Sequence, residues 1–302
     1  MGPPLLDLSG PQSIQAPRSD AYVMTDMTQP FCFIHIEKTA GITLHNMLHR
    51  DFFNYISPSP KHCDTMDRSY MDSLRRYFPF RVDGIGGHMV NGVDDYRFST
   101  SGPIIRFAFL RDPVERFISH FNWQNLVMGK GWTFEAFVAD EHFANFQCHR
   151  LSKRRSFEAA KEVLDRLDFV GETARFDMSI LCLAKLLDGM SPLYERSNVK
   201  DYKGEGLSVK TLDPAMLDKV RAANAEDQRL FDYAQANIFP RQAETFGVSE
   251  ADVATFRAQN EGYRFPWTTL KKRRASNAVL KLMIQPFLKA PPPLSTPRPT
   301  LA

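Results

Sequence analysis

Residues 31–50 read FCFIHIEKTAGITLHNMLHR, and the change of pattern within this stretch decides the fold. Phe31 to Ile36 is an apolar run with aromatic and β-branched residues, as expected of a buried strand. A short loop with small residues follows and contains Gly41. From Ile42 onward the apolar residues can share one broad helical face. The stretch therefore predicts a strand, a tight loop and a helix.

The start of this helix is predicted to bind an anion. The first N–H groups of a helix have no partner within it, and the helix dipole adds partial positive charge there. Lys38 supplies a cation, and Thr39 and Thr43 supply two hydroxyls. The stretch is not a Walker A loop, because the glycine-flanked spacing and the final Lys-Ser/Thr pair are missing. We interpret it as a different kind of phosphate cradle.

A second unit of this kind is IIRFAFLRDPVERFISHFNW, residues 104–123. Its apolar start predicts a strand, Asp112 suits a helix N-cap, and the following proline suits the first helical turn. Arg111 ends the strand and Ser119 lies along the helix. Because ligands of open α/β sheets collect at the carboxyl ends of strands, both are candidates for holding a second anion. An ion pair of Arg111 with Asp112 or Glu115 is the alternative.

The segment FRVDGIGGHMVNG, residues 80–92, contains a candidate base. Val82 and Ile85 predict a short strand edge, and the glycines allow the backbone to bend or to approach a ligand closely. His88 follows directly, and imidazole titrates close to neutral pH. A structural histidine at a turn is the alternative.

The remaining elements follow from hydrophobic spacing and helix caps. We predict helices over 133–146, 156–166 and 176–187, a strand over 167–170, and one long helix from Asp213 to about Phe239. The basic run 153–155 is interpreted as a solvated face, with the entrance for an acidic acceptor as the alternative.

The composition indicates a globular protein that does not bind nucleic acid. The chain has 302 residues, of which 43% are hydrophobic and 24% charged, and its net charge is +3. Binding to nucleic acid would require more strongly clustered positive charge. The four cysteines include no C-x-x-C pair, so we expect free thiols in a reducing compartment, with no zinc site and no disulfide framework.

Three regions are predicted along the chain. Residues 1–28 are expected to be a disordered N-terminal arm, 29–265 the folded domain, and 266–302 a basic helix with a Pro-rich tail. The sequence shows no signal peptide and no apolar run long enough to span a membrane. The basic, partly amphipathic segment 271–289 is a candidate for peripheral contact with a membrane surface, and a helix that caps the core is the alternative.

The two anion-binding units together predict a ligand with two separated phosphate-like groups. A nucleotide phosphorylated at both ends of its ribose has this character. Dinucleotides are disfavoured because no G-x-G-x-x-G follows a strand. ATP is disfavoured because a Walker A loop and a clear acidic pair for Mg²⁺ are missing.

These motifs resemble those of the carbohydrate-type sulfotransferase family, in its heparan sulfate 2-O-sulfotransferase-like, bacterial-type branch. FIHIEKTAGITL resembles the signature FxHIPKTAGTTL, and FAFLRDPVERFISHF resembles the second signature of the family. GGHMVNG is similar to the segment with the catalytic histidine, and FVGETARFDMSILCLAKLL to the FVGxxExF segment. RSNVKDY and LFDYAQ resemble the C-terminal part, so the likeness runs with gaps over about residues 31–240. Glu37 stands where the signature has proline, and Ile42 where threonine is common.

The resemblance implies a P-loop-NTPase-like three-layer α/β fold, with a central parallel sheet flanked by helices. It also implies an enzyme that uses 3′-phosphoadenylyl sulfate (PAPS) as co-substrate and requires no metal. His88 would be the general base, and Lys38 would stabilise the leaving phosphate. The 5′-phosphate would be held by Lys38, Thr39, Ala40, Gly41, Ile42 and Thr43, and the 3′-phosphate by Arg111 and Ser119.

The acceptor is expected to be a hydroxyl of a carbohydrate or glycolipid, and the sequence does not indicate the oligomeric state. Animal members of the family usually have an N-terminal membrane anchor. Because none is seen in this sequence, we expect a cytoplasmic enzyme, with the inner membrane face as a candidate site of peripheral contact. A non-catalytic nucleotide-binding or membrane-associated scaffold and an ATP-dependent, kinase-like phosphotransferase are the alternatives.

Overall fold

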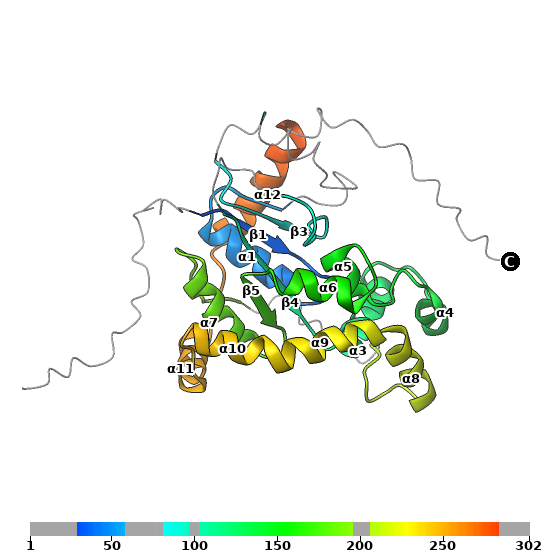
Figure 1. The fold of residues 1–302 in the computed structure, drawn as a ribbon. Helices are drawn as coiled ribbons and strands as arrows, with labels where there is room; N and C mark the ends of the chain where they lie inside the picture. The colour runs from blue at the N-terminus through cyan, green and yellow to red at the C-terminus, as the bar shows by residue number, and fades with distance from the viewer. Residues whose placement is uncertain (1–28, 58–75, 77–80, 97–102, 196–205, 284–302) are drawn as a thin grey trace, which may run out of the picture.

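The computed structural model describes residues 29–57, 76, 81–96, 103–195 and 206–283 (Figure 1). Its described strands form one five-stranded, all-parallel sheet in the order β2-β3-β1-β4-β5. They are β1 (Phe31–Ile34), β2 (Tyr55–Ile56), β3 (Gly84–Gly87), β4 (Ile105–Leu110) and β5 (Phe169–Glu172). The predicted strands at 31–36, 104–110 and 167–170 are confirmed, with small shifts of their ends.

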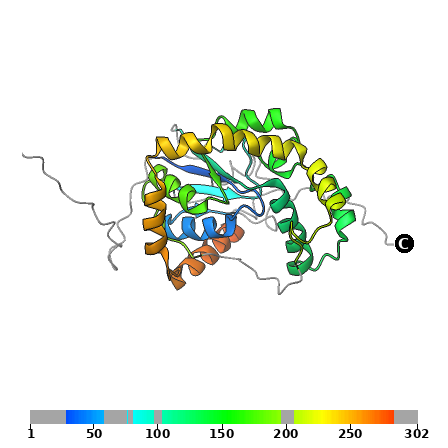
Figure 2. The ribbon, with the colours of Figure 1, turned by 90° about the horizontal axis from the view of Figure 1, so that it is seen from below.

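Helices cover both faces of the sheet, so the protein is an α/β protein in three layers (Figure 2). One face carries α5 (Phe146–Ser152), α6 (Phe157–Leu164) and α9 (Ala225–Asn237). The other carries α1 (Gly41–Asp51), α7 (Phe176–Leu186) and α11 (Glu250–Asn260). Beside the sheet pack α3 (Pro113–Asn122), the π-helical turn η1 (Trp123–Val127), α4 (Phe134–Ala139) and α8 (Pro214–Ala223). The remaining described helices are α10 (Phe239–Thr245) and α12 (Trp267–Met283).

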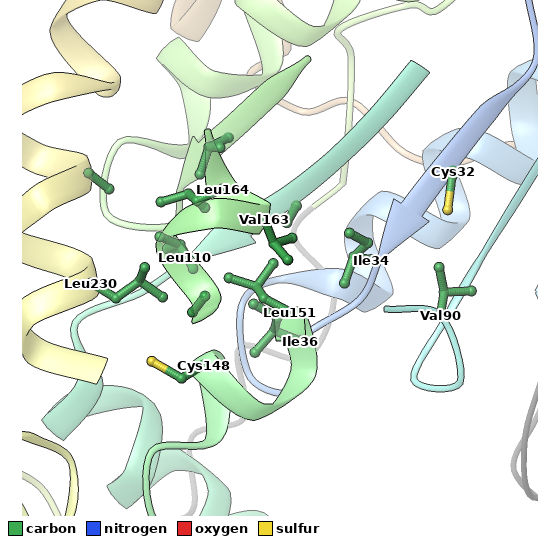
Figure 3. Packing of buried hydrophobic residues seen from close by; sticks show 14 of the residues in the cluster. Cys32, Ile34, Ile36, Val90, Leu110, Cys148, Leu151, Val163, Leu164 and Leu230 are labelled. Atoms are coloured by element: carbon green, nitrogen blue, oxygen red, sulfur yellow. The ribbon is translucent and has the colours of Figure 1, made fainter. Parts of the chain in front are cut away.

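The central strand β1 divides its side chains between the two layers of helices. Cys32 and Ile34 face α5, α6 and α9, whereas Phe31 and Phe33 face α1 and α7. This alternation follows from the two-residue repeat of a strand. All four side chains are fully buried. Figure 3 shows the first of these two cores, in which residues of α5, α6 and α9 meet the sheet.

The glycines of β3 make room for aromatic rings of the core. A Cβ on Gly84 would lie 2.3 Å from the ring of Phe31, and one on Gly86 would lie 2.3 Å from the hydroxyl of Tyr55. The sequence analysis assigned these glycines to backbone bending or close approach to a ligand. The structure corrects that interpretation for Gly84 and Gly86, which are required for packing.

The helix starts predicted at Asp112 and Asp213 are confirmed, and side chains cap further helices. The carboxylate of Asp112 accepts a hydrogen bond from the N–H of Glu115 at 2.8 Å, at the start of α3. Asp213 caps α8 in the same way. Ser249 and Asp252 form a reciprocal capping box at the start of α11. Each of these capping residues lies within a few positions of the helix that it starts, so it can be recognised from the local sequence.

The predicted helix over 133–146 is confirmed at its start but is too long. Helix α4 ends at Ala139, and a separate helix, α5, begins at Phe146 and occupies the segment between the predicted helices 133–146 and 156–166. The start of α5 is fixed from a distance, because the carboxylate of Asp227 accepts hydrogen bonds from the N–H groups of Gln147 at 2.9 Å and Cys148 at 2.8 Å. No residue near α5 in the sequence indicates this cap.

The predicted single helix from Asp213 to about Phe239 is wrong, because it consists of α8, α9 and the start of α10. Asn224 ends α8, since its side-chain amide donates to the carbonyl of Val220 at 2.8 Å. Pro240 lies in the first turn of α10, where a proline is tolerated although it would break a helix interior.

Helix α12 packs against α1 and β2, which confirms the core-capping alternative for the part of 271–289 that the structure describes. Lys272 donates to the carbonyl of Arg50 at 3.1 Å, and Arg273 donates to the side chain of Asn46 at 3.2 Å. The predicted arm 1–28 and the Pro-rich tail lie outside the described residues. Within the described part of the chain, no helix has the length and apolar character required to cross a membrane.

Candidate functional site

The carboxyl ends of four parallel strands meet at one pocket of about 300 Å³. Lys38 follows β1, His88 follows β3, Arg111 follows β4 and Thr173 follows β5, and all four line this pocket. The volume lies at the lower end of the range that is typical of small-molecule sites, about 300–1,000 Å³.

Most of the predicted site residues line this one pocket. They are Lys38, Ala40, Gly41, Ile42, His88, Arg111 and Ser119. Thr39 and Thr43 do not line it, and their side chains are buried. The hydroxyl of Thr39 donates to the carbonyl of Ile36 at 2.8 Å, so it stabilises the loop from within.

The loop between β1 and α1 contains residues with positive φ angles, and it leads into a helix start that packs closely against His35. Lys38 (φ 72°) and Ala40 (φ 63°) adopt left-handed conformations, which are uncommon for non-glycine residues. Gly41 then begins α1, and a Cβ at this position would lie 1.8 Å from Nε2 of His35. Only glycine therefore lets the helix start lie against the His35 ring.

Lys38 lies near an aromatic residue that the sequence analysis did not select. Its Nζ is 5.9 Å from the ring centroid of Trp123, which also lines the pocket. Trp123 follows Ser119 by four residues where α3 passes into η1. This spacing puts both residues on one side of the helix, and it is the signal that could have identified Trp123.

Arg111 forms the ion pair that was the alternative prediction, and it also lies at the pocket. Its guanidinium pairs with Glu115, with Nη2 3.2 Å from Oε2, and Nη1 donates to the carbonyl of Lys38 at 3.3 Å. At the same time Arg111 lines the pocket. Because the side chain of Glu115 is 54% exposed, this pair is held weakly and an anion in the pocket can compete for the guanidinium.

The backbone of Arg111 is held by a fully buried glutamine. Gln147 accepts from the N–H of Arg111 at 3.1 Å and donates to its carbonyl at 2.9 Å. Since Asp227 in turn binds the N–H of Gln147, α9 and α5 together fix the end of β4.

His88 lies between a buried histidine and an ion pair. Its ring stacks on the ring of His35 with centroids 4.1 Å apart, and its Nδ1 is 3.3 Å from the carbonyl oxygen of His35. Nδ1 is also 3.5 Å from Oε1 of Glu37. The guanidinium of Arg150 binds both oxygens of Glu37 and donates to the carbonyl of His88 at 2.8 Å.

Behind His88, a chain of buried polar rings leads into the core. His35 Nδ1 is 3.0 Å from His45 Nε2, and His45 Nδ1 is 2.8 Å from the hydroxyl of Tyr55. Burial lowers the pKa of His35 and of His45 well below the usual value, because a charged imidazole is poorly solvated there. Burial, followed by the charge of Arg273, lowers the pKa of the nearby His49 to about 3.

These neutral histidines predict that the protein loses stability in mild acid. The unfolded chain binds protons at these imidazoles below pH 6.5 and the folded protein does not, so the free energy of unfolding falls as the pH falls from 7 to 5. For His49 alone the expected loss at pH 5 is about 2 kcal/mol. Urea unfolding at pH 7 and at pH 5 measures this loss in the free energy of unfolding.

Two variants make this prediction specific. His49→Gln can keep a hydrogen bond to Ser57 and is expected to flatten the pH dependence, whereas the exposed His142→Gln is expected to leave it unchanged. An unfolding free energy that does not change between pH 7 and pH 5 would contradict the assignment of neutral imidazoles.

The supporting residues of α5 were not predicted from the sequence. Gln147 and Arg150 lie between the predicted helices 133–146 and 156–166, and their partners are far away in the chain. Glu37 was noted only because it stands where the family signature has proline. That substitution is the one local signal that could have directed attention to the pair with Arg150.

A scan against protein-family models and a search of curated proteins found no match to this chain. Among the described residues, no cluster of three or more His, Cys, Asp or Glu side chains could hold a metal ion.

Proposed function

We propose that this protein is a PAPS-dependent sulfotransferase that transfers a sulfuryl group to a hydroxyl of a carbohydrate or glycoconjugate. The observation that supports the proposal best is that one pocket collects Lys38, His88 and Arg111 from the ends of three neighbouring strands. These are the residues to which the resemblance assigns leaving-group stabilisation, base catalysis and binding of the 3′-phosphate.

The P-loop-NTPase-like identity of the fold is part of the same proposal. It is supported by the central place of β1 in the sheet and by the tight loop that leads from β1 into the start of α1. The N-cap residue Ala40 has no side chain that could cap the helix, and the first turn of α1 contains no acidic residue. An anion at this helix start therefore meets N–H groups and the positive end of the helix dipole.

PAPS, the proposed sulfuryl donor, would be held both at its 5′-phosphosulfate and at its 3′-phosphate. The 5′-phosphosulfate would lie at the start of α1, where Thr39 can contribute only its backbone N–H because its hydroxyl binds Ile36. The 3′-phosphate would lie at Arg111 and Ser119, where it would compete with Glu115 for the guanidinium. The residues proposed for the 5′ end are Lys38, Thr39, Ala40, Gly41, Ile42 and Thr43.

The surroundings of His88 determine which ring atom acts as the base. A carbonyl oxygen can only accept a hydrogen bond, so the contact with His35 favours a proton on Nδ1 of neutral His88. This leaves the lone pair on Nε2 for the proton of the acceptor hydroxyl. As the acceptor oxygen bonds to sulfur, the bond between sulfur and the bridging phosphate oxygen breaks, and Lys38 stabilises the charge on that oxygen.

Nucleotide binding tests the donor assignment. We expect calorimetry to show tighter binding of 3′,5′-ADP than of 5′-ADP or ATP, without a requirement for Mg²⁺. Arg111→Ala should weaken binding of 3′,5′-ADP by about 10- to 100-fold, since a hydrogen bond to a charged group contributes about 1.5–3 kcal/mol. Arg221→Ala is the matched control, because Arg221 also pairs with a carboxylate on its own exposed helix face.

The outcomes of this experiment separate the alternatives. Mg²⁺-dependent preference for ATP would contradict the proposal and favour a kinase-like phosphotransferase. Equal affinity for 3′,5′-ADP and 5′-ADP would show that Arg111 and Ser119 do not bind a 3′-phosphate. Tight binding of 3′,5′-ADP without turnover on any acceptor would favour the scaffold.

Peripheral membrane contact is proposed for the outer face of α12. Trp267 is 68% exposed, Lys271 lies 4.0 Å from its ring centroid, and Arg274 is exposed one turn further along. A tryptophan beside two cations suits an anionic lipid surface.

Co-sedimentation with vesicles tests this contact. Changing Lys271 and Arg274 to alanine should lower partitioning onto anionic vesicles by about 30-fold, at roughly 1 kcal/mol for each cation. The same loss of charge at Lys219 and Arg221 on α8, far from α12 in Figure 1, is the control. Equal partitioning of both double variants would contradict the assignment.

A further inference from the structure

Glu37 places a carboxylate next to the proposed base. It lies in the loop after β1, with its side chain 16% exposed, and its Oε1 is 3.5 Å from Nδ1 of His88. The family signature resembled by this stretch has proline at this position, and proline could make no such contact. The pair of Glu37 with His88 is therefore a property of this chain.

Arg150 holds this carboxylate in position. Its Nε donates to Oε2 of Glu37 at 2.9 Å, and Nη2 donates to Oε1. A two-point contact between a guanidinium and a carboxylate fixes orientation as well as distance. Arg150 also donates from Nη1 to the carbonyl of His88 at 2.8 Å, so one side chain fixes the positions of both partners.

The helix that carries Arg150, α5, is anchored in the core. Its neighbours on α5, Cys148 and Leu151, are fully buried and pack against the sheet (Figure 3). Its guanidinium also lies 4.9 Å from the ring centroid of Phe146. The position of Glu37 is thus determined by a packed helix as well as by its own loop.

These contacts favour a supporting role for Glu37 and not a role as the base itself. Both of its oxygens accept hydrogen bonds from Arg150, so the carboxylate is engaged with the guanidinium and not with an acceptor hydroxyl. His88 is the more accessible group, with its side chain 31% exposed at the pocket. A carboxylate beside Nδ1 can orient the imidazole and stabilise the positive charge that forms when Nε2 takes a proton.

We propose that Glu37, held by Arg150, is the positioning residue for His88. This inference rests on the proposed sulfuryl transfer. In that step the acceptor proton moves to Nε2 of His88, the acceptor oxygen bonds to sulfur, and the bond from sulfur to the 5′-phosphate oxygen breaks. Glu37 takes no proton, and its charge balances the imidazolium until the proton leaves to solvent.

Steady-state kinetics with PAPS test this role through Glu37→Gln, His88→Ala and the double variant. We expect Glu37→Gln to lower kcat by about 10- to 100-fold, the effect of losing a hydrogen bond to a charged group, with KM for PAPS nearly unchanged. The change should have little further effect in the His88→Ala background, because Glu37 acts through His88. Glu158→Gln, which breaks an exposed pair with Arg229, is the control.

A second readout does not depend on turnover. Nitrogen NMR of the His88 ring reports which nitrogen carries the proton in the neutral form. We expect the Nδ1–H form in the wild type, a smaller fraction of it in Glu37→Gln, and no change in Glu158→Gln. Binding of 3′,5′-ADP shows that each variant is folded.

The two readouts separate failure of this inference from failure of the proposed function. Wild-type kcat in Glu37→Gln, or losses that simply add in the double variant, would overturn the role of Glu37 while leaving the sulfotransferase intact. An unchanged His88 tautomer in Glu37→Gln would also overturn it. Absence of PAPS turnover in the wild type, with the tautomer shifted in Glu37→Gln, would count against the function but support the pairing.

Discussion

His88→Ala is expected to lower kcat for acceptor-dependent PAPS turnover by about 10²- to 10⁴-fold, the usual contribution of a general base. The acceptor hydroxyl is a poor nucleophile until its proton is removed, and Nε2 of His88 is the proposed proton acceptor at the pocket. The contacts of Nδ1 with His35 and Glu37 hold the ring from the opposite side. Steady-state kinetics at saturating acceptor measure the effect.

Binding and a distant histidine provide the controls for this result. His88→Ala should retain affinity for 3′,5′-ADP, because the proposed contacts of His88 are with the acceptor and not with the nucleotide. His142→Ala changes a histidine whose side chain is 90% exposed, and it should have wild-type kcat. A kcat in His88→Ala within a few-fold of the wild type would remove His88 from the mechanism.

Lys38→Ala is expected to lower kcat by about 10²- to 10³-fold, similar to the loss of one donor that stabilises a developing negative charge. Negative charge builds on the bridging phosphate oxygen as it leaves sulfur. Lys38 lies in the left-handed backbone at the entry to α1, where its ammonium reaches the pocket beside Trp123. Single-turnover measurements of PAPS consumption isolate this step.

A lysine on the outer surface serves as the matched control. Lys161 pairs with Asp165 on an exposed face of α6, so Lys161→Ala should leave the single-turnover rate unchanged. If Lys38→Ala weakened PAPS binding but left the single-turnover rate intact, Lys38 would hold the donor and not stabilise the leaving group.

Local sequence signals were sufficient for much of the fold. The apolar runs at 31–36 and 104–110 predict β1 and β4 because buried parallel strands are apolar on both faces. Asp112 and Asp213 predict helix starts because a cap acts on N–H groups two or three residues away. The residues after these strands could also be selected as a site, since strand ends in a parallel sheet lie at one edge.

Several failures share a physical cause, which is contact between residues far apart in the chain. The start of α5 depends on Asp227, about eighty residues later, and the backbone of Arg111 is held by Gln147. The ion pair between Glu37 and Arg150 likewise joins two segments that no local pattern relates. The glycines of β3 were misinterpreted for the same reason, because the ring that needs the space at Gly84 belongs to another strand.

The most direct test of the account is whether the purified protein releases 3′,5′-ADP from PAPS only when a hydroxyl acceptor is present. A panel of neutral glycans, acidic glycans and glycolipids, assayed with and without a chelator, covers the proposed acceptor classes. We predict acceptor-dependent release with sulfate recovered on the glycan. Release of 3′,5′-ADP at the same rate without any acceptor, or turnover of ATP in place of PAPS, would contradict the account.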